Sequence, residues 1–185
     1  MTRVEAREAA SALSDIAEIA RRVRQSRIYQ LSSLLMVMWG ILVFAGNIGS
    51  FLWPRSAGLF WLAVYVAGIA GSFAISAAGY SRTGVRSFDG RMLIAFLLFI
   101  AFGVFCCWLG HLATPRQIGT FWAIYFMLFY TIAGLWVGHA YVAIGLAITA
   151  LTLVGYFFAG DWFEPWMAVV NGGGLMLGGL WMRRS

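Results

Sequence analysis

The side chains of this chain that could do chemistry are few, and they lie in or beside its longest apolar segments. Seven polar or ionisable residues form a candidate site: Asn47, Arg55, His111, Arg116, Asp161, Glu164 and Asn171. The topology argued below places all of them toward the outer side of a membrane. They therefore predict an outward-facing polar site, and the alternative is a rim in which the two acids pair with the two arginines.

Asn47 and Asn171 are the two most polar side chains within the apolar segments. Amides inside a membrane commonly form hydrogen bonds between helices, because lipid offers no other partner. We favour that role for both residues over ligand binding. If a pocket exists, these two amides predict that it opens toward the outer side.

His111, His139, Cys106 and Cys107 are the residues that could ligate a metal or a haem. Paired histidines can hold a haem, but the predicted topology puts His111 and His139 almost a bilayer thickness apart. The adjacent cysteines lack the second pair of ligands that a metal site needs, so apolar packing is their predicted role. We expect no metal and no cofactor.

No acid and no arginine falls in the middle of an apolar segment. A proton pump, an ion-coupled transporter with a carboxylate site and an intramembrane aspartyl protease all need such a group. The run Asn171-Gly172-Gly173-Gly174 is not a phosphate loop, since neither Lys nor Ser or Thr follows it directly. No catalytic residue can be assigned, and we expect no enzyme activity.

The composition indicates which elements must position these side chains. The chain has 185 residues, of which 62% are hydrophobic and only 11% are charged, far from the balance of a soluble domain. A membrane-spanning helix needs about 20 apolar residues, and the uncharged runs supply them. We predict an all-α membrane protein whose transmembrane domain, residues 28–185, has six transmembrane helices. The predicted spans are residues 28–50, 57–79, 92–112, 118–138, 140–160 and 166–182.

The arginines indicate how these spans are oriented, because all 13 basic residues are Arg. With the N-terminus inside, all of them except Arg55 and Arg116 lie on the cytoplasmic side, as the positive-inside rule requires. We expect a multi-pass protein of a bacterial inner membrane with both termini in the cytoplasm. The pI of about 9.9 reflects these flanking arginines, so no nucleic-acid partner is expected.

Residues 2–27, in a cytoplasmic segment of residues 1–27, predict an amphipathic helix. Leu13, Ile16, Ile19, Ala20 and Val23 recur at three- and four-residue spacing, with charged residues elsewhere. Arginines close to the first span could meet anionic lipid headgroups. We interpret the segment as an anchor on the lipid bilayer, and the alternative is a docking helix for a protein partner.

The three prolines each follow a glycine by five positions and predict an internal repeat of three antiparallel hairpins. Glycine suits the end of a helix, and proline suits its first turn. Residues 54–61 and 115–122 are identical at five of eight positions, which supports a duplication. The predicted turn residues are Gly49 and Pro54, Gly110 and Pro115, and Gly160 and Pro165.

Small residues at four-residue spacing predict close packing of the helices. They let helix backbones approach each other within the bundle or between subunits. Glycine-lined faces also permit copies of the chain to associate, and we expect a homo-oligomer. The residues concerned are Gly68, Ser72 and Ser76, Gly134 and Gly138, and Gly174 and Gly178.

The spacing of the hairpins from Leu34 to Arg184, with the segment Trp39-Gly40-Ile41-Leu42, resembles the HdeD-like family of small bacterial inner-membrane proteins. That family is associated with acid resistance, so the resemblance implies a stress-associated membrane protein. The N-terminal amphipathic helix and the high tryptophan content depart from the family. Residues 25–32 are also similar to uncharacterised six-span bacterial families, and neither resemblance implies a catalytic residue.

Two functions of different class follow from these features. The first is a non-catalytic stress-associated or regulatory membrane protein that acts through residues 2–27 or through the surface of the helix bundle. The second is a small channel or passive transporter for a small neutral solute or an ion, with a pathway near Asn47 and Asn171. We favour the first, partly because of the resemblance to the HdeD-like family.

Overall fold

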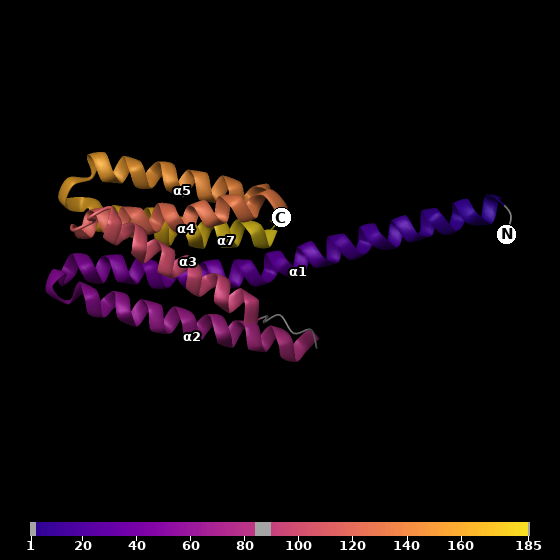
Figure 1. The fold of residues 1–185 in the computed structure, drawn as a ribbon, viewed down its shortest axis with the longest axis horizontal. Helices are drawn as coiled ribbons and strands as arrows, with labels where there is room; N and C mark the ends of the chain where they lie inside the picture. Colours follow the sequence, from indigo (N-terminus) through magenta and orange to yellow (C-terminus); the bar gives the residue numbers. More distant parts are fainter. Residues whose placement is uncertain (1–2, 84–89, 185) are drawn as a thin grey trace.

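The computed structural model describes residues 3–83 and 90–184, and within them the side chains of Leu13, residues 29–78 and residues 94–183. The described chain is all-α (Figure 1). Its elements, in chain order, are α1 (Arg3–Leu52), the 3-10 helix η1 (Pro54–Ser56), α2 (Ala57–Thr83), α3 (Gly90–Leu109), α4 (Pro115–Val137), α5 (His139–Phe158), the 3-10 helix η2 (Gly160–Trp162), α6 (Phe163–Met167), the π-helix η3 (Ala168–Gly173) and α7 (Gly174–Arg184). We call α6, η3 and α7 together the last segment.

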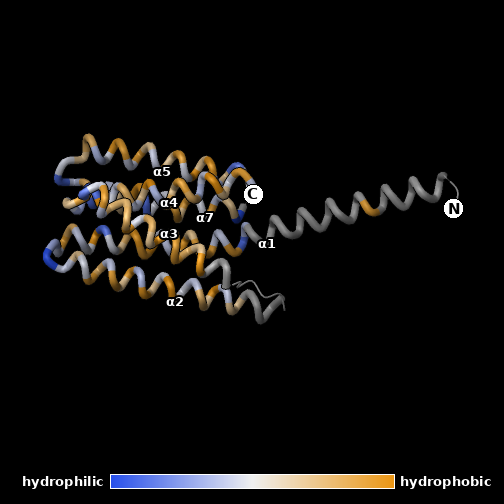
Figure 2. The backbone as a smooth tube through the Cα atoms, viewed as in Figure 1, coloured by the Kyte–Doolittle hydropathy of each residue, from blue (hydrophilic) through white to orange (hydrophobic). Residues whose placement is uncertain are grey.

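Four helices are long and apolar enough to cross a membrane, and their orange colour in Figure 2 follows their hydropathy. They comprise residues Tyr29–Leu52, Pro54–Ala78, Pro115–Val137 and His139–Phe158, while Ile94–Leu109 is a shorter apolar helix. Large apolar side chains cover their outsides, including Phe158 and Trp136, which are 82% and 80% exposed. Such a surface suits lipid rather than water, which confirms the prediction of a multi-helix membrane protein.

α1 is one uninterrupted helix, whereas the sequence predicted a separate helix ending near residue 27. Residues 25–31 contain neither Gly nor Pro, so nothing stops the helix before the apolar part begins at Tyr29. The N-terminal half of α1 consequently extends far beyond the other helices (Figure 1). The lipid contacts predicted for the arginines of residues 2–27 lie outside the described side chains.

The apolar part of α1 packs against the last segment along a seam of small residues. A Cβ atom added at Gly40 would lie 2.7 Å from the Gly172 carbonyl oxygen, and one at Gly172 would lie 2.7 Å from the Phe44 backbone nitrogen. Further along, a Cβ at Gly179 would lie 2.9 Å from the Ser33 carbonyl oxygen. The two backbones therefore touch, which is how helices associate tightly in lipid.

α2 packs on another face of α1, but here side chains fill the space. Gly68 receives the Trp39 ring, and the Trp39 indole Nε1 donates a hydrogen bond to the Ser72 hydroxyl at 3.1 Å. Near the turn between the helices, Gly49 lies against the Phe60 ring. α1 thus holds α2 through aromatic rings set into gaps left by glycines.

α4 and α5 form a second pair of helices with close backbone contact. A Cβ at Gly134 would lie 2.7 Å from the Val142 nitrogen, and one at Gly145 would lie 2.9 Å from the Met127 carbonyl oxygen. The last segment joins this pair as well, because Gly174 lies against Ile148 and Gly178 against Ile144. It therefore lies between α1 and the α4–α5 pair and connects both halves of the core.

The turns follow the order of the three predicted hairpins, but the hairpins are not the units that pack most closely. The closest backbone approaches join α1 to the last segment and α4 to α5, whereas the predicted middle hairpin, α3 with α4, is loosely packed. α3 crosses obliquely in Figure 1 and meets α4 through the stacked rings of Phe99 and Tyr125, 4.2 Å apart, and through Gly103 beside Trp122. Hairpin spacing in the sequence determines the order of the turns and leaves the partners of each helix open.

The last predicted span, residues 166–182, is not one regular helix. It begins in the short α6, continues as a π-helix over Ala168–Gly173 and ends in α7, which extends to Arg184. Three consecutive glycines follow Asn171 and weaken the α-helical pattern, while Gly172 lets this turn reach the α1 backbone. Three of the predicted turn residues lie where helices begin or turn: Pro54 and Pro115 begin helices, and Gly160 has a positive φ of 53°. The other three lie elsewhere, since Gly49 is inside α1, Gly110 follows the end of α3 and Pro165 is inside α6.

Candidate functional site

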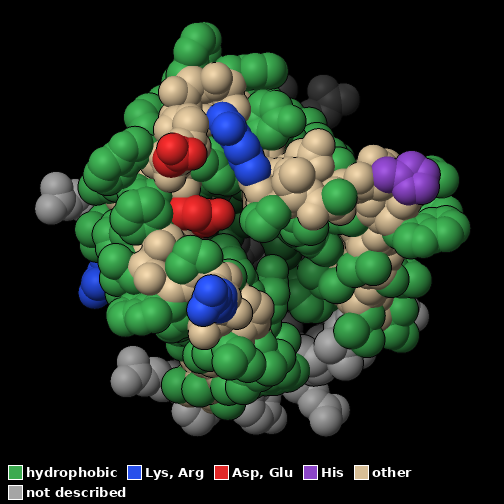
Figure 3. Space-filling model, turned by 90° about the vertical axis from the view of Figure 1, so that its left-hand side faces the viewer, with side chains coloured by type: hydrophobic (Ala, Val, Ile, Leu, Met, Phe, Trp, Pro, Cys, Tyr) green, Lys and Arg blue, Asp and Glu red, His purple; other side chains and the backbone are tan. Residues whose placement is uncertain are grey.

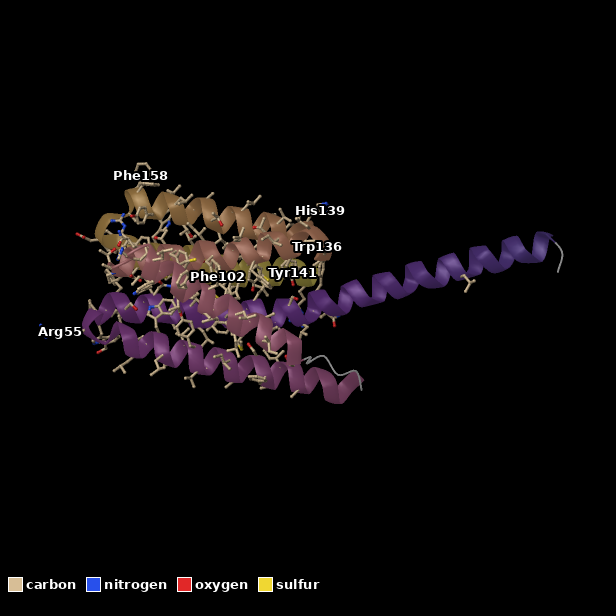
Figure 4. The ribbon with its side chains drawn as sticks, viewed as in Figure 1. Arg55, Phe102, Trp136, His139, Tyr141 and Phe158 are labelled. Atoms are coloured by element: carbon tan, nitrogen blue, oxygen red, sulfur yellow. The ribbon has the colours of Figure 1, made fainter. Side chains whose placement is uncertain are left out.

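Four of the five charged residues whose side chains the structure describes, Arg55, Arg116, Asp161 and Glu164, lie at one end of the bundle, which we call the turn end. Arg55 and Phe158 lie there in Figure 4, whereas Trp136, His139 and Tyr141 lie at the opposite end, from which α1 extends. Figure 3 views the turn end and shows acidic and basic side chains set among apolar ones. We call the opposite end the arm end.

The seven predicted site residues differ widely in exposure. Arg55, His111 and Asp161 are exposed, Arg116 and Glu164 are half-buried, and Asn47 and Asn171 are buried at 5% and 6% exposure. His111 follows α3 with a positive φ of 50°. Among the described residues, no hydrogen bond or ion pair joins any two of the seven, so they do not form one compact site.

The two buried asparagines bond within their own helices. The Asn47 Nδ2 donates to the Val43 carbonyl oxygen at 2.8 Å, and the Asn171 Nδ2 lies 3.9 Å from the Met167 sulfur. α1, which carries Asn47, packs against η3, which carries Asn171, but no hydrogen bond joins the two amides among the described residues. The interhelical amide bond favoured from the sequence therefore does not occur within the described part of the chain.

Glu164 lies in α6 near the turn end. Burial raises the pKa of its carboxyl group above the ordinary value. The predicted rim of paired charges is not present, because no ion pair forms within residues 29–78 and 94–183. The guanidinium group of Arg116 instead contacts backbone carbonyls of α5.

Arg116 closes the α4–α5 pair at the turn end, and the start of α4 positions it. Pro115 is the first residue of α4, and Thr114 and Gln117 form a reciprocal capping box, with the Gln117 nitrogen 3.2 Å from the Thr114 hydroxyl. The Arg116 Nη2 donates to the carbonyl oxygens of Gly155, at 3.3 Å, and of Tyr156. These carbonyls end α5, where a cation is favourable.

Aromatic rings complete the surroundings of the guanidinium group. The Arg116 Cζ lies 5.3 Å from the centre of the Tyr156 ring and 5.4 Å from that of Phe163. Both contacts are within the range of a cation–π interaction. Arg116 therefore joins α4, α5 and α6, although its Nε atom is buried without a hydrogen-bond partner among the described residues.

Two residues that the sequence analysis did not single out share this feature. The hydroxyls of Thr120 and Thr152 are buried and have no hydrogen-bond partner in the described part of the chain. A helical hydroxyl in lipid normally bonds the carbonyl four residues earlier, as Thr131 and Thr149 do at 2.8 Å and 2.7 Å. Thr120 follows Arg116 by four residues, and this spacing was the available sequence signal.

The residues predicted to pack or to ligate metals are placed as follows. Gly138 ends α4 with a φ of 151° beside the Tyr29 hydroxyl, which donates to the Val137 carbonyl oxygen at 3.3 Å. Ser76 is half-buried in α2, and Cys106 and Cys107 are free thiols on α3. Across the described ranges, no group of three or more His, Cys, Asp or Glu could hold a metal ion.

A search for known proteins similar to this chain found no matching family model, no matching curated sequence and no matching solved structure.

Proposed function

We propose that the chain is a non-catalytic, six-span inner-membrane protein that binds a partner through the N-terminal half of α1. We call that half, residues 3–28, the arm. The single observation that carries the proposal is the continuity of α1, which makes the arm a rigid extension of the central helix of the bundle. The stress-associated role implied by the HdeD-like resemblance is the cellular setting in which such a protein would act.

Six spans are consistent with the lengths of the remaining two segments. α3 adds an apolar helix over Ile94–Leu109, and the last segment runs from Phe163 to Arg184 alongside α1 and α5. The arginine distribution supports an orientation with the arm and Arg184 in the cytoplasm and the turn end outside. This orientation gives the arm access to cytoplasmic proteins.

The arm suits docking because it is long and leaves the bundle. At 1.5 Å per residue, 26 helical residues extend about 39 Å. Leu13 lies midway along it and is 68% exposed, and in the sequence it begins the apolar stripe that continues to Val23. An apolar stripe held away from the bundle gains most when another helix or protein surface covers it.

α1 also connects the arm to a large part of the core. Its apolar part contacts α2, α6, η3 and α7. Where α1 leaves the bundle, Tyr29 bonds the end of α4 and packs beside Tyr141 of α5. A partner that tilts or turns the arm would therefore act directly on the packing of the bundle, which supports a regulatory rather than a catalytic role.

Photo-crosslinking in native membranes tests the proposal. A photoreactive amino acid replaces Leu13 in one variant and Phe158, which is 82% exposed on the bundle, in the control. We expect a discrete protein adduct from position 13 and lipid adducts from position 158. Deletion of residues 2–24 should leave the melting temperature of the bundle unchanged and abolish co-purification of that partner with the chain.

Lipid adducts alone at position 13 would contradict the proposal, since they would place the arm on the membrane surface as an anchor. A protein adduct of twice the chain mass would identify the partner as a second copy. An adduct of any other mass would identify a separate protein by mass spectrometry. Both protein outcomes support docking.

A passive route for a small neutral solute or ion is the second candidate. The observation that favours it is the π-helix around Asn171, because π-turns in membrane helices are frequent at functional sites. Solute flux into liposomes containing the full chain measures this activity directly. Replacing both Asn47 and Asn171 by Leu should stop the flux, and unchanged flux in that variant would remove this pathway.

A further inference from the structure

Three buried polar atoms near the turn end have no hydrogen-bond partner within the described chain. They are the Nε of Arg116 and the hydroxyl oxygens of Thr120 and Thr152, with Thr120 only 7% and Thr152 0% exposed. Leaving a donor unpaired inside a protein is costly, and in a membrane water cannot reach it from the lipid side. Three such atoms in one region therefore indicate a group that these side chains bind.

The three atoms belong to one junction of three helices. Arg116 and Thr120 are four residues apart and so lie on one face of α4. Arg116 bonds the Tyr156 carbonyl of α5, and Thr152 lies on the same face of α5 one turn deeper. Phe163 of α6, whose ring faces the Arg116 guanidinium, supplies the third side.

Packing around the junction is apolar. Phe163 and Met167 of the last segment form a buried cluster with Ala123, which lies one turn below Thr120 on α4. On α5, Ile148 lies one turn below Thr152 and contacts Gly174. The unpaired polar atoms thus form a small polar spot within an apolar surround, which limits the size of a ligand.

The two threonines differ from four other helical hydroxyls of the bundle. Ser50, Ser72, Thr131 and Thr149 each donate to the carbonyl four residues earlier, at 2.7–2.9 Å. Thr120 and Thr152 are also helical, yet among the described residues their hydroxyls have no hydrogen-bond partner. Their protons are therefore available to a bound acceptor.

The charge at the junction determines what kind of acceptor fits. Arg116 has no carboxylate partner among the described residues, and its Nε carries a proton that only an acceptor can take. A cation would be repelled by the guanidinium group, whereas an anion would gain both charge and hydrogen bonds. The α5 carbonyls accept from Nη2, and the two aromatic rings lie near Cζ, so none of these contacts takes the Nε proton.

We propose that the junction of α4, α5 and α6 binds a small monovalent anion of halide size. The Arg116 Nε–H and the Thr120 hydroxyl donate to it from α4. The Thr152 hydroxyl donates from the opposite, deeper wall on α5. The anion neutralises the one arginine that the turn end holds between helices, and so links outer halide concentration to the packing of the α4–α5 pair.

Bromide is the probe for this site, with the full chain purified in detergent. Melting temperatures are measured in sodium bromide and in sodium gluconate at equal ionic strength, and crystals grown in bromide are examined for anomalous scattering. We expect bromide to raise the melting temperature and to scatter at the junction. Gluconate is too large to enter and should have no effect.

Isosteric variants separate binding from folding. Thr120→Val and Thr152→Val should each weaken the bromide effect by about tenfold in concentration, as loss of a bond to a charged ligand predicts. Thr120→Ser, which keeps the hydroxyl, should retain the effect. The matched controls Thr131→Val and Thr149→Val remove hydroxyls that already bond carbonyls, and both should respond to bromide as the unchanged chain does.

Ordered water at the junction together with equal melting temperatures in bromide and gluconate would overturn the proposal. Bromide scattering only at exposed Arg55 would also overturn it, because that outcome reports an adventitious ion only. A bromide effect that survives in Thr120→Val and Thr152→Val would show that the anion binds elsewhere. None of these outcomes depends on whether the arm binds a partner.

Discussion

The seam between α1 and the last segment and the contact between α3 and α4 are two opposite ways of holding a helix in a bundle. Along the seam, glycines bring backbones together, so that a Cβ atom at Gly172 would lie 2.6 Å from the Phe44 Cβ. At α3, aromatic rings make the contact, with the Tyr125 hydroxyl donating to the Phe99 carbonyl oxygen at 3.0 Å. The first contact has no adjustable part, whereas the second consists of side chains that can rotate.

This difference indicates which parts of the molecule are fixed. Lipid is as apolar as leucine, so helices gain little by burying apolar surface and depend on close packing instead. α1 and the last segment have that packing, whereas α3 has exposed apolar residues along much of its length, including Phe102 at 64%. We infer that α1 with the last segment is the permanent core and that α3 is the helix whose position can change.

The largest effect should come from adding one methyl group to the seam. Gly172→Ala places a Cβ against the Phe44 backbone, and overpacking of this kind costs about 1–3 kcal/mol. Gly173→Ala is the matched control, because nothing lies within 4 Å of a Cβ at that position. Unfolding of both variants in mixed detergent measures the difference, and equal stabilities would refute the rigid seam.

A smaller effect is expected at α3. Phe99→Ala removes the ring that stacks on Tyr125, at a cost of about 0.5–1.5 kcal/mol. Phe102→Ala, at an exposed position on the same helix, serves as the control and should change stability little. We also expect Phe99→Ala to speed labelling of Cys106 and Cys107 by a membrane-permeant thiol reagent, since α3 would separate from α4. Unchanged labelling would mean that other contacts hold α3.

The smallest effect concerns the last segment near the turn end. Because burial raises the pKa of Glu164, the folded chain keeps a proton that the unfolded chain loses, so stability falls as pH rises above the ordinary pKa of about 4.5 toward the folded value. Glu164→Gln should therefore be slightly more stable at neutral pH and lose that dependence. Melting curves from pH 4 to pH 8 measure it, with exposed Asp161→Asn as the control. A steeper dependence in Glu164→Gln would contradict this account.

The sequence was sufficient for the class of fold because lipid leaves few alternatives. Long uncharged runs must become helices, and four of the six predicted spans correspond to long apolar helices. Helix partners were less predictable, because a Gly-Pro spacing reports where the chain turns and not which helices approach each other. The π-helix was also missed, since it results from glycines meeting the α1 backbone across more than 100 residues of chain.

The sequence indicated that charged side chains lie at the ends of the apolar runs, but it did not identify the unpaired buried hydroxyls. Charges at Arg55, Asp161 and Glu164 were readable from the ends of apolar runs, and the structure keeps Arg55 at the turn end. Thr120 gave only its four-residue spacing from Arg116 as a signal and Thr152 gave none, because threonine is common in membrane helices and usually bonds its own backbone. Only the packed structure distinguishes the two hydroxyls without a partner from those that have one.

Because α1 is uninterrupted, the arm has a defined rotational orientation relative to the bundle as well as a defined length. Each helical residue turns the chain by about 100° and advances it by 1.5 Å, so the apolar stripe that starts at Leu13 has one angular phase relative to the seam at Gly40. One residue inserted near Gln25 would turn the stripe by about 100°, whereas seven would return it to within about 20°. The length of the segment between arm and bundle therefore determines the angular position of a docked partner around the bundle. Insertions or deletions in this segment would rotate the partner about the axis of α1.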